Sequence, residues 1–142
     1  MIPYMKPQIA VETIIHSSIE KVWDAWTMPE HITKWCQASD GWHAPSASND
    51  LRVGGIFTTR MEARDGSAGF DFGGTYTNVE LYKKIEYIME DGRKVSIGFT
   101  SVGGEVKVVE MFDPENQNPE DVQRAGWQAI LNNFKHYVEA DT

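Results

Sequence analysis

Cysteine and basic residues are the two components that this sequence has least of. Cys36 is the only cysteine in 142 residues, so an internal disulfide framework is excluded. The chain has 13 Lys and Arg against 21 Asp and Glu, and its net charge is −8. No run of basic residues is longer than two. Because nucleic-acid and anionic-membrane binding both rest on positive patches, we expect neither kind of partner.

Long apolar runs are absent as well, and none approaches the roughly 20 residues that a membrane-spanning helix needs. The first eight residues, MIPYMKPQ, lack the charged start and apolar core of a signal peptide. Together with the single cysteine, these absences predict a cytoplasmic protein without membrane insertion. The length favours one domain over 1–142, which is enough chain to bury a sizeable core.

Patterns that hold metals or cofactors are also missing. His31, Cys36 and His43 match no common zinc spacing, in which ligands are paired two to four residues apart. Asp40 and His43 could form an acid/base pair across a short loop, but such a pair needs a positioned substrate. The glycine pairs do not follow a strand and open a helix at the spacing that phosphate binding requires. We therefore expect no metal and no cofactor, and the sequence identifies no catalytic residue.

The strongest pattern that is present is an amphipathic helix over 118–139. Asn118 is the expected N-cap and Pro119 the first helical residue. Gly126 interrupts a row of large apolar residues, which predicts a close contact between helix and sheet at that point. At about 100° per residue, one broad side carries the apolar residues and the opposite side the polar ones. The apolar side holds Trp127, Ile130, Leu131, Phe134, Tyr137 and Val138, and the polar side Arg124, Gln128, Lys135 and Glu139.

The chain before this helix begins with a strand over 7–16 and a pair of short helices. Ser17, with Glu20 three residues later, predicts the cap of the first helix. Pro29 opens the second helix, which ends near Trp35. The stretch 37–54 is rich in Ser, Asp, Gly and Asn, which indicates a loop with at most one short strand near Trp42.

A series of strands follows, each bounded by a turn signal. The expected strands are 56–63, 70–81, 84–89, 94–100 and 105–112, and Gly73-Gly74 indicates a bulge or sharp bend. This order predicts an α+β fold, in which a curved antiparallel sheet wraps around the long C-terminal helix. The two short helices after the first strand would close one end.

Three charged residues, Arg60, Glu62 and Glu110, lie within the predicted strands. The second face of an antiparallel sheet is usually solvated, so exposed cross-strand pairing is one interpretation. The other is that one of them faces the helix, where it would orient the polar head group of a ligand. The sequence leaves both interpretations open.

Four motifs resemble those of the family of activator-of-heat-shock-protein-90-ATPase homologues. They are S-x-x-x-V-W-x-A-W-T-x-P-E-H-I-x-x-W (18–35), L-R-V-G-G-x-F (51–57), F-x-G-x-Y (72–76) and G-W-x-x-x-L (126–131). That family belongs to the START-like, or SRPBCC, superfamily, whose fold is called a helix grip. The resemblance implies a cavity between sheet and terminal helix, which many superfamily members use for lipids, hormones or polyketides. It implies no universal catalytic set, and the motifs do not carry chaperone activation over to this chain.

The leading functional hypothesis is therefore a module that binds an apolar or amphipathic small molecule between the sheet and the C-terminal helix. One alternative is a protein-interaction module that docks a partner through 37–54 or through the sheet. Another is a hydrolase or cyclase that uses the same cavity. The predicted wall consists of three helix residues, four strand residues and two residues at the ends of the cavity. These are Trp127, Ile130 and Phe134; Phe57, Met61, Ile97 and Phe99; and Trp26 and Trp42.

Overall fold

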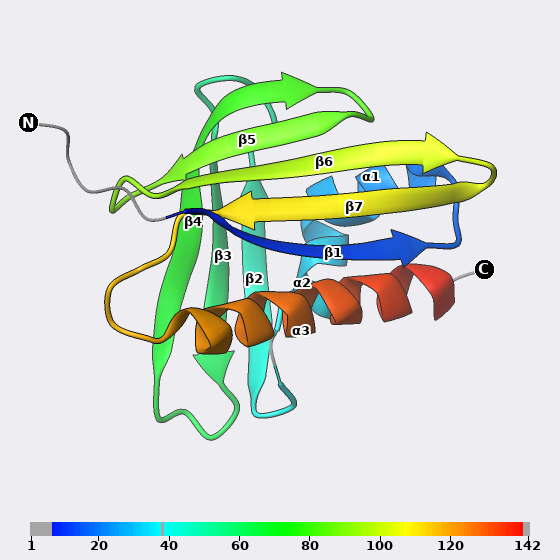
Figure 1. The fold of residues 1–142 in the computed structure, drawn as a ribbon. Helices are drawn as coiled ribbons and strands as arrows, with labels where there is room; N and C mark the ends of the chain where they lie inside the picture. The colour runs from blue at the N-terminus through cyan, green and yellow to red at the C-terminus, as the bar shows by residue number, and fades with distance from the viewer. Residues whose placement is uncertain (1–6, 38, 141–142) are drawn as a thin grey trace, which may run out of the picture.

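Seven antiparallel strands form one sheet in the order β1-β7-β6-β5-β4-β3-β2 (Figure 1). The structure is a computed structural model that describes residues 7–37 and 39–140, so most of the stretch considered for a signal peptide lies outside the described residues. The strands are β1 (Ile9–Ile15), β2 (Trp42–Asn49), β3 (Ile56–Ala63), β4 (Gly69–Glu80), β5 (Lys84–Met89), β6 (Lys94–Val102) and β7 (Glu105–Phe112). The helices are α1 (Ile19–Thr27), α2 (Pro29–Trp35) and α3 (Glu120–Ala140). This is the predicted α+β helix-grip architecture.

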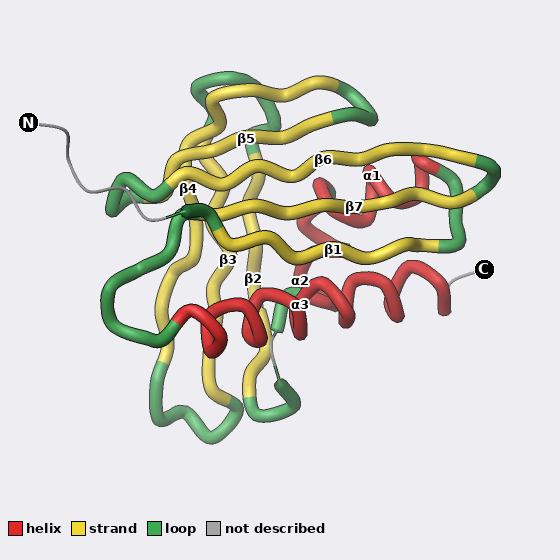
Figure 2. The backbone as a smooth tube through the Cα atoms, in the orientation of Figure 1, coloured by secondary structure: helices red, strands yellow, loops and turns green. Residues whose placement is uncertain are grey.

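The sheet curls strongly, so that β2, β3 and the first half of β4 run across the direction of β5, β6 and β7 (Figure 2). The predicted bend at Gly73 and Gly74 lies in β4, where the neighbouring strands approach the backbone closely. A Cβ atom on Gly73 would lie 2.3 Å from the carbonyl oxygen of Phe57, and one on Gly74 would lie 2.6 Å from that of Ile88. No side chain fits at either distance, so glycine is required for this approach.

Helices α1 and α2 join β1 and β2, which are the two edge strands of the sheet. They close one end of the curled sheet, as predicted (Figure 1). The N-cap of α1 is Ser18 rather than the predicted Ser17, since the Ser18 hydroxyl accepts a hydrogen bond from the Lys21 N–H at 3.2 Å. Trp35 ties the helix pair together by donating from Nε1 to the Ala25 carbonyl oxygen at 2.8 Å.

Helix α3 lies alongside β1 and covers that edge of the sheet (Figure 1). Lys135 Nζ donates to the Ile14 carbonyl oxygen at 2.6 Å, and Gln128 Nε2 donates to that of Glu12 at 3.1 Å. The polar side of the helix thus pairs backbone groups that an open edge strand would expose. The first helical residue is Glu120, one position after the predicted Pro119, and Asn118 donates from Nδ2 to Glu115 Oε1 instead of capping the helix.

The largest departure from the sequence prediction is β2, an eight-residue strand in the stretch interpreted mainly as a loop. Its pairing with β3 shifts register between His43 and Ser46, where Pro45 lies. Pro45 has no N–H to donate, and an edge strand with a bulge tolerates that loss. The strand forms because β3 supplies a pairing edge, a tertiary effect that local composition does not reveal.

Candidate functional site

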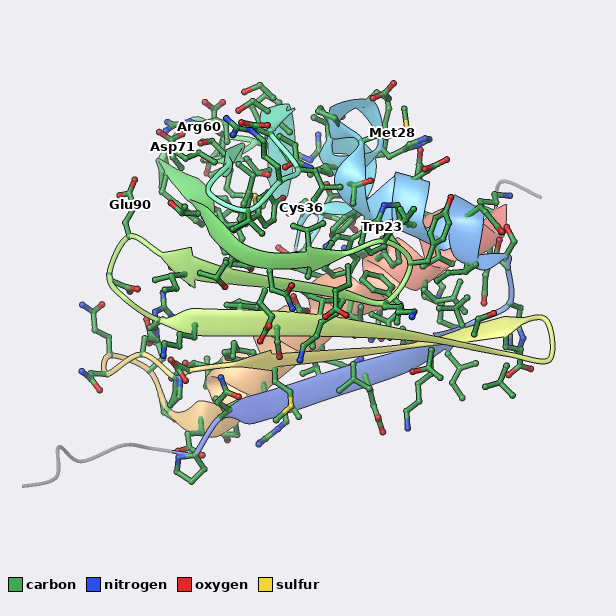
Figure 3. All side chains as sticks on the ribbon, turned by 90° about the horizontal axis from the view of Figure 1, so that it is seen from above. Trp23, Met28, Cys36, Arg60, Asp71 and Glu90 are labelled. Carbon is green, nitrogen blue, oxygen red and sulfur yellow. The ribbon has the colours of Figure 1, made fainter. Side chains whose placement is uncertain are left out.

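A cavity of about 560 Å³ lies between the inner face of the sheet, the end of α2 and the first half of α3. The exposed residues of its wall all lie at one end of the molecule. They belong to the start of β4, the β5–β6 turn, the segment before α3 and the first turn of α3. The mouth of the cavity is therefore at this end, away from α1. Figure 3 shows Asp71 and Glu90 on this side, whereas Cys36 lies in the interior beside α2.

Aromatic rings form a large part of the cavity wall. The Trp127 ring stacks on Phe112 with centroids 3.9 Å apart and an interplanar angle of 11°. Phe57 contacts Tyr87 edge-on at 4.7 Å. Trp127 also meets Phe72, at 6.1 Å. Such interlocked rings have few alternative rotamers, so they fix the shape of the cavity wall, and Trp127 connects α3 to the rings of the sheet.

Five of the nine residues predicted to form the wall do line this cavity: Trp26, Phe57, Met61, Trp127 and Ile130. Four lie elsewhere. Ile97 is completely buried in the sheet core. Phe99 and Phe134 belong to an aromatic cluster under α1 and α2. In that cluster Trp26 lies 4.9 Å from Phe134 and 5.9 Å from Phe99. Trp42, half-buried on β2, contacts Phe70 at 5.8 Å.

Phe99 and Phe134 lie outside the cavity wall because α1 and α2 pack against them, and the alternation of residues along a strand cannot predict that packing. The rings of Trp23 and Trp35 fill the space beneath these helices. Trp23 lies 5.3 Å from Phe99, and Trp35 lies 4.8 Å from Phe134. That end of the sheet is consequently solid core, and the cavity occupies only the half beneath the start of α3.

Gly126 does not contact the sheet, contrary to the sequence prediction. A Cβ atom at this position would meet nothing within 4 Å, and the residue lines the cavity. The glycine therefore leaves space in the cavity wall instead of permitting close helix packing.

Glu110 is one of the three charged strand residues whose orientation the sequence left open, and its side chain faces the interior. It lies on β7, the second strand from one edge of the sheet, between Val11 of β1 and Ile97 of β6. It lines the cavity with only 7% of its surface exposed. Burial raises the pKa of its carboxyl group to about 8. The regular alternation of Val106, Val108, Glu110 and Phe112 was the signal that could have placed it inward.

Cys36 and Tyr87 bring two further polar groups to this interior. Burial, with a smaller contribution from the charge of Glu110, raises the pKa of the Cys36 thiol to about 12. Burial likewise raises the pKa of Tyr87, with Glu110 the next cause. Both groups are neutral at physiological pH. Since the thiolate is the nucleophilic form of cysteine, the geometry does not support nucleophilic catalysis by Cys36.

The other two charged strand residues lie on the outer face, as the first interpretation expected. Arg60 donates from Nε to Glu62 at 3.0 Å and from Nη1 to Asp71 at 3.4 Å. Arg60 and Asp71 lie side by side at the outer surface of β3 and β4 (Figure 3). They form an ordinary cross-strand ion pair.

The candidate metal and acid/base residues do not come together. His31 is hydrogen-bonded through Nδ1 to the Tyr137 hydroxyl at 2.5 Å, and Cys36 is buried in the cavity wall. His43 lies 3.9 Å from Glu62 rather than beside Asp40. Within residues 7–37 and 39–140, no group of three His, Cys, Asp or Glu side chains is placed to hold a metal ion.

Comparison with known proteins agrees with this architecture. The family model for Activator of Hsp90 ATPase homolog 1-like protein matches residues 16–139, most of the chain. The chain belongs to this family. The AHSA1-like protein from Aeromonas hydrophila, solved by NMR, is 48% identical with a TM-score of 0.89. That match covers 94% of this chain and 93% of the other. No curated protein sequence shows a significant match to this chain.

Two further solved structures share this fold, one at high and one at low sequence identity. A protein from Cytophaga hutchinsonii is 55% identical with a TM-score of 0.82, over 94% of this chain and 93% of that one. A protein from Nitrosomonas europaea shares only 17% identity, yet its TM-score is 0.83 over 96% of both chains. The second likeness shows the fold alone. No helix in the described part of the chain is long and apolar enough to cross a membrane.

Proposed function

We propose that this AHSA1-like protein binds an apolar or amphipathic small molecule in the cavity between α3 and the sheet. The observation that carries the proposal is the cavity itself, about 560 Å³ in volume and walled mainly by aromatic and aliphatic side chains. Ligand sites in proteins are typically concave, largely apolar and of 300 to 1,000 Å³. The cavity volume falls within that range.

Two features of the wall support ligand binding over a packing defect. Trp127 of the wall stacks on the ring of Phe112, a fully buried core residue, which favours a wall that keeps its shape without an occupant. Met61 adds a flexible, polarizable side chain that can adapt to ligands of different shape. An apolar ligand would gain about 25 cal/mol per Å² of surface removed from water, before the costs of association.

The mouth offers a route for such a ligand. Phe70 and Val122 both line the cavity and are about half exposed, at 49% and 54%. Apolar side chains at the rim keep a ligand partly desolvated as it enters, and exposed apolar surface beside a pocket is a common mark of a binding site.

The test is a titration with N-phenyl-1-naphthylamine, an uncharged dye that fluoresces in apolar surroundings. The wild-type protein should enhance its fluorescence at micromolar concentration. Ile130→Trp should abolish the enhancement because the larger ring fills the cavity. Ile14→Trp is the matched control, since Ile14 is 46% exposed and lies outside the cavity wall. It should leave binding unchanged.

Two results would contradict the proposal. One is the absence of dye binding by a folded wild-type protein at high micromolar concentration. The other is unfolding of Ile130→Trp while Ile14→Trp folds normally, which would mean that the space is occupied core. Either result would favour the protein-interaction alternative instead.

A further inference from the structure

Acidic side chains outnumber basic ones in the wall of the cavity, and this bears on what the cavity can hold. Besides Glu110 inside, the described residues of the wall include four carboxylates, Asp71, Glu90, Asp91 and Glu115. The same set contains one guanidinium and neither lysine nor histidine. The guanidinium, Arg93, already donates to Asp91 at 2.7 Å, and Asp71 is paired with Arg60 of the outer face at 3.4 Å. Glu90 and Glu115 are therefore the acidic side chains of the mouth that have no basic partner among the described residues.

The Glu110 carboxyl is also short of partners within the protein. Among the described residues, every fully enclosed polar side-chain atom has a hydrogen-bond partner. Burial is the only cause of the raised pKa of Glu110, and no hydrogen bond or neighbouring charge contributes. Since the Glu110 oxygens have no such partner, they are not among the fully enclosed atoms, and they must border the open space of the cavity. A buried carboxyl group without a partner is costly, and a ligand that supplies one removes that cost.

We propose that Glu110 is the recognition group of the cavity and that the ligand is an apolar molecule carrying an amine, bound as its ammonium ion. This inference rests on the proposed function. The apolar part of the ligand would lie against Trp127 and Ile130, and the ammonium group would donate hydrogen bonds to the ionised carboxylate. A fatty acid would meet no unpaired cation among the described residues of the wall, and its charge would be repelled by the acidic side chains of the mouth.

Proton balance follows from this assignment. Free Glu110 is mostly protonated at pH 7, because its pKa is about 8. When an ammonium ligand binds, the Glu110 proton leaves to solvent and the carboxylate forms the ion pair. Each binding event therefore releases close to one proton. The other titratable groups beside Glu110 are Cys36 and Tyr87, both neutral throughout this range.

The affinity for an amine should consequently rise with pH. The ionised fraction of Glu110 is about 1% at pH 6 and about one half at pH 8. If only the ionised form pairs with the ligand, the affinity for a permanently protonated amine increases about 50-fold across that interval. An uncharged ligand of the same length should show no such increase.

The experiment compares decylamine, decan-1-ol and decanoate as competitors of N-phenyl-1-naphthylamine at pH 6, 7 and 8. Calorimetry in two buffers of different ionisation enthalpy counts the protons released. We expect decylamine to bind tightest at pH 8, with the pH dependence above, and to release about one proton at pH 6 and about half a proton at pH 8. Glu110→Gln should weaken decylamine about tenfold or more and remove its pH dependence, while decan-1-ol changes less than twofold. Glu62→Gln, on the outer face, is the matched control.

The outcomes separate this inference from the proposed function. Equal binding of amine and alcohol, unaffected by Glu110→Gln, would overturn the role of Glu110 and leave the cavity function intact. Preference for decanoate would overturn the amine class. Failure of every probe to bind would overturn both. If Glu110→Gln does not fold, the wild-type pH profile and proton count decide between these outcomes without it.

Discussion

Replacing Glu110 should change how the stability of the protein depends on pH. In the folded chain the carboxyl pKa is about 8, against an ordinary value of 4.5. The folded state therefore binds a proton more tightly than the unfolded state. Between these two values the native protein holds more protons, so its free energy of unfolding falls as pH rises. The cost of burying this group is small at acidic pH and large at alkaline pH.

The magnitude follows from the two pKa values. Relative to a neutral side chain, the Glu110 carboxyl destabilises the fold by about 1 kcal/mol at pH 5 and by about 4 kcal/mol at pH 8. Glu110→Gln keeps the shape of the side chain and removes the titration. We therefore expect the stability difference, variant minus wild type, to grow by about 3 kcal/mol between pH 5 and pH 8.

The assay is urea unfolding of both proteins at pH 5 and pH 8, followed by circular dichroism. Any constant cost of placing an amide in the cavity cancels, because only the change with pH is compared. Contributions of exposed carboxylates cancel as well, since both proteins contain them. Glu62→Gln, which removes an exposed carboxylate from the outer face, should parallel the wild type. If Glu110→Gln also runs parallel to the wild type, the carboxyl is solvated or paired and its assignment to a dry interior is wrong.

Three further predictions concern the rest of the fold. Gly126→Ala should raise the free energy of unfolding by up to about 1 kcal/mol in a urea melt, because the new methyl group meets no atom within 4 Å and alanine favours the helix. A lower free energy of unfolding for this variant would instead indicate a close contact between helix and sheet at this position. Lys135→Met should lower it by about 1 kcal/mol, since it removes the donor to the Ile14 carbonyl, and no loss would mean that water replaces this bond. Chelator treatment should leave the melting temperature unchanged, whereas a drop reversed by zinc would reveal a structural metal site.

The fold could be predicted from the sequence because its signals are local. Turn glycines and alternating residues marked β3, β5 and β7 at their observed bounds, and 3.6-residue periodicity marked the helices. The exception was β2, whose Ser, Pro and Asn residues indicate a loop. That strand depends on pairing with β3, which no local pattern encodes.

The site was predictable only in part, because it depends on which apolar residues meet one another. The alternation along the strands correctly predicted that Phe57 and Met61 face the cavity. It also predicted this for Ile97 and Phe99, which lie where helices or strands fill the space. Periodicity on α3 could not distinguish Phe134, which packs on Trp35, from Ile130, which faces the cavity. The position of Glu110 stayed open at the level of sequence because charged residues on strands are most often solvated.

The most direct test of the central claim is an isotope-filtered nuclear Overhauser experiment on labelled protein with bound N-phenyl-1-naphthylamine. At 16.1 kDa the chain is well suited to NMR. The account predicts contacts from the dye to the methyl groups of Met61 and Ile130, which line the cavity. It predicts none to Ile14 or Val102, which are exposed and lie outside it. Contacts to these outer residues, or bound dye without contacts to Met61 and Ile130, would contradict a ligand site between α3 and the sheet.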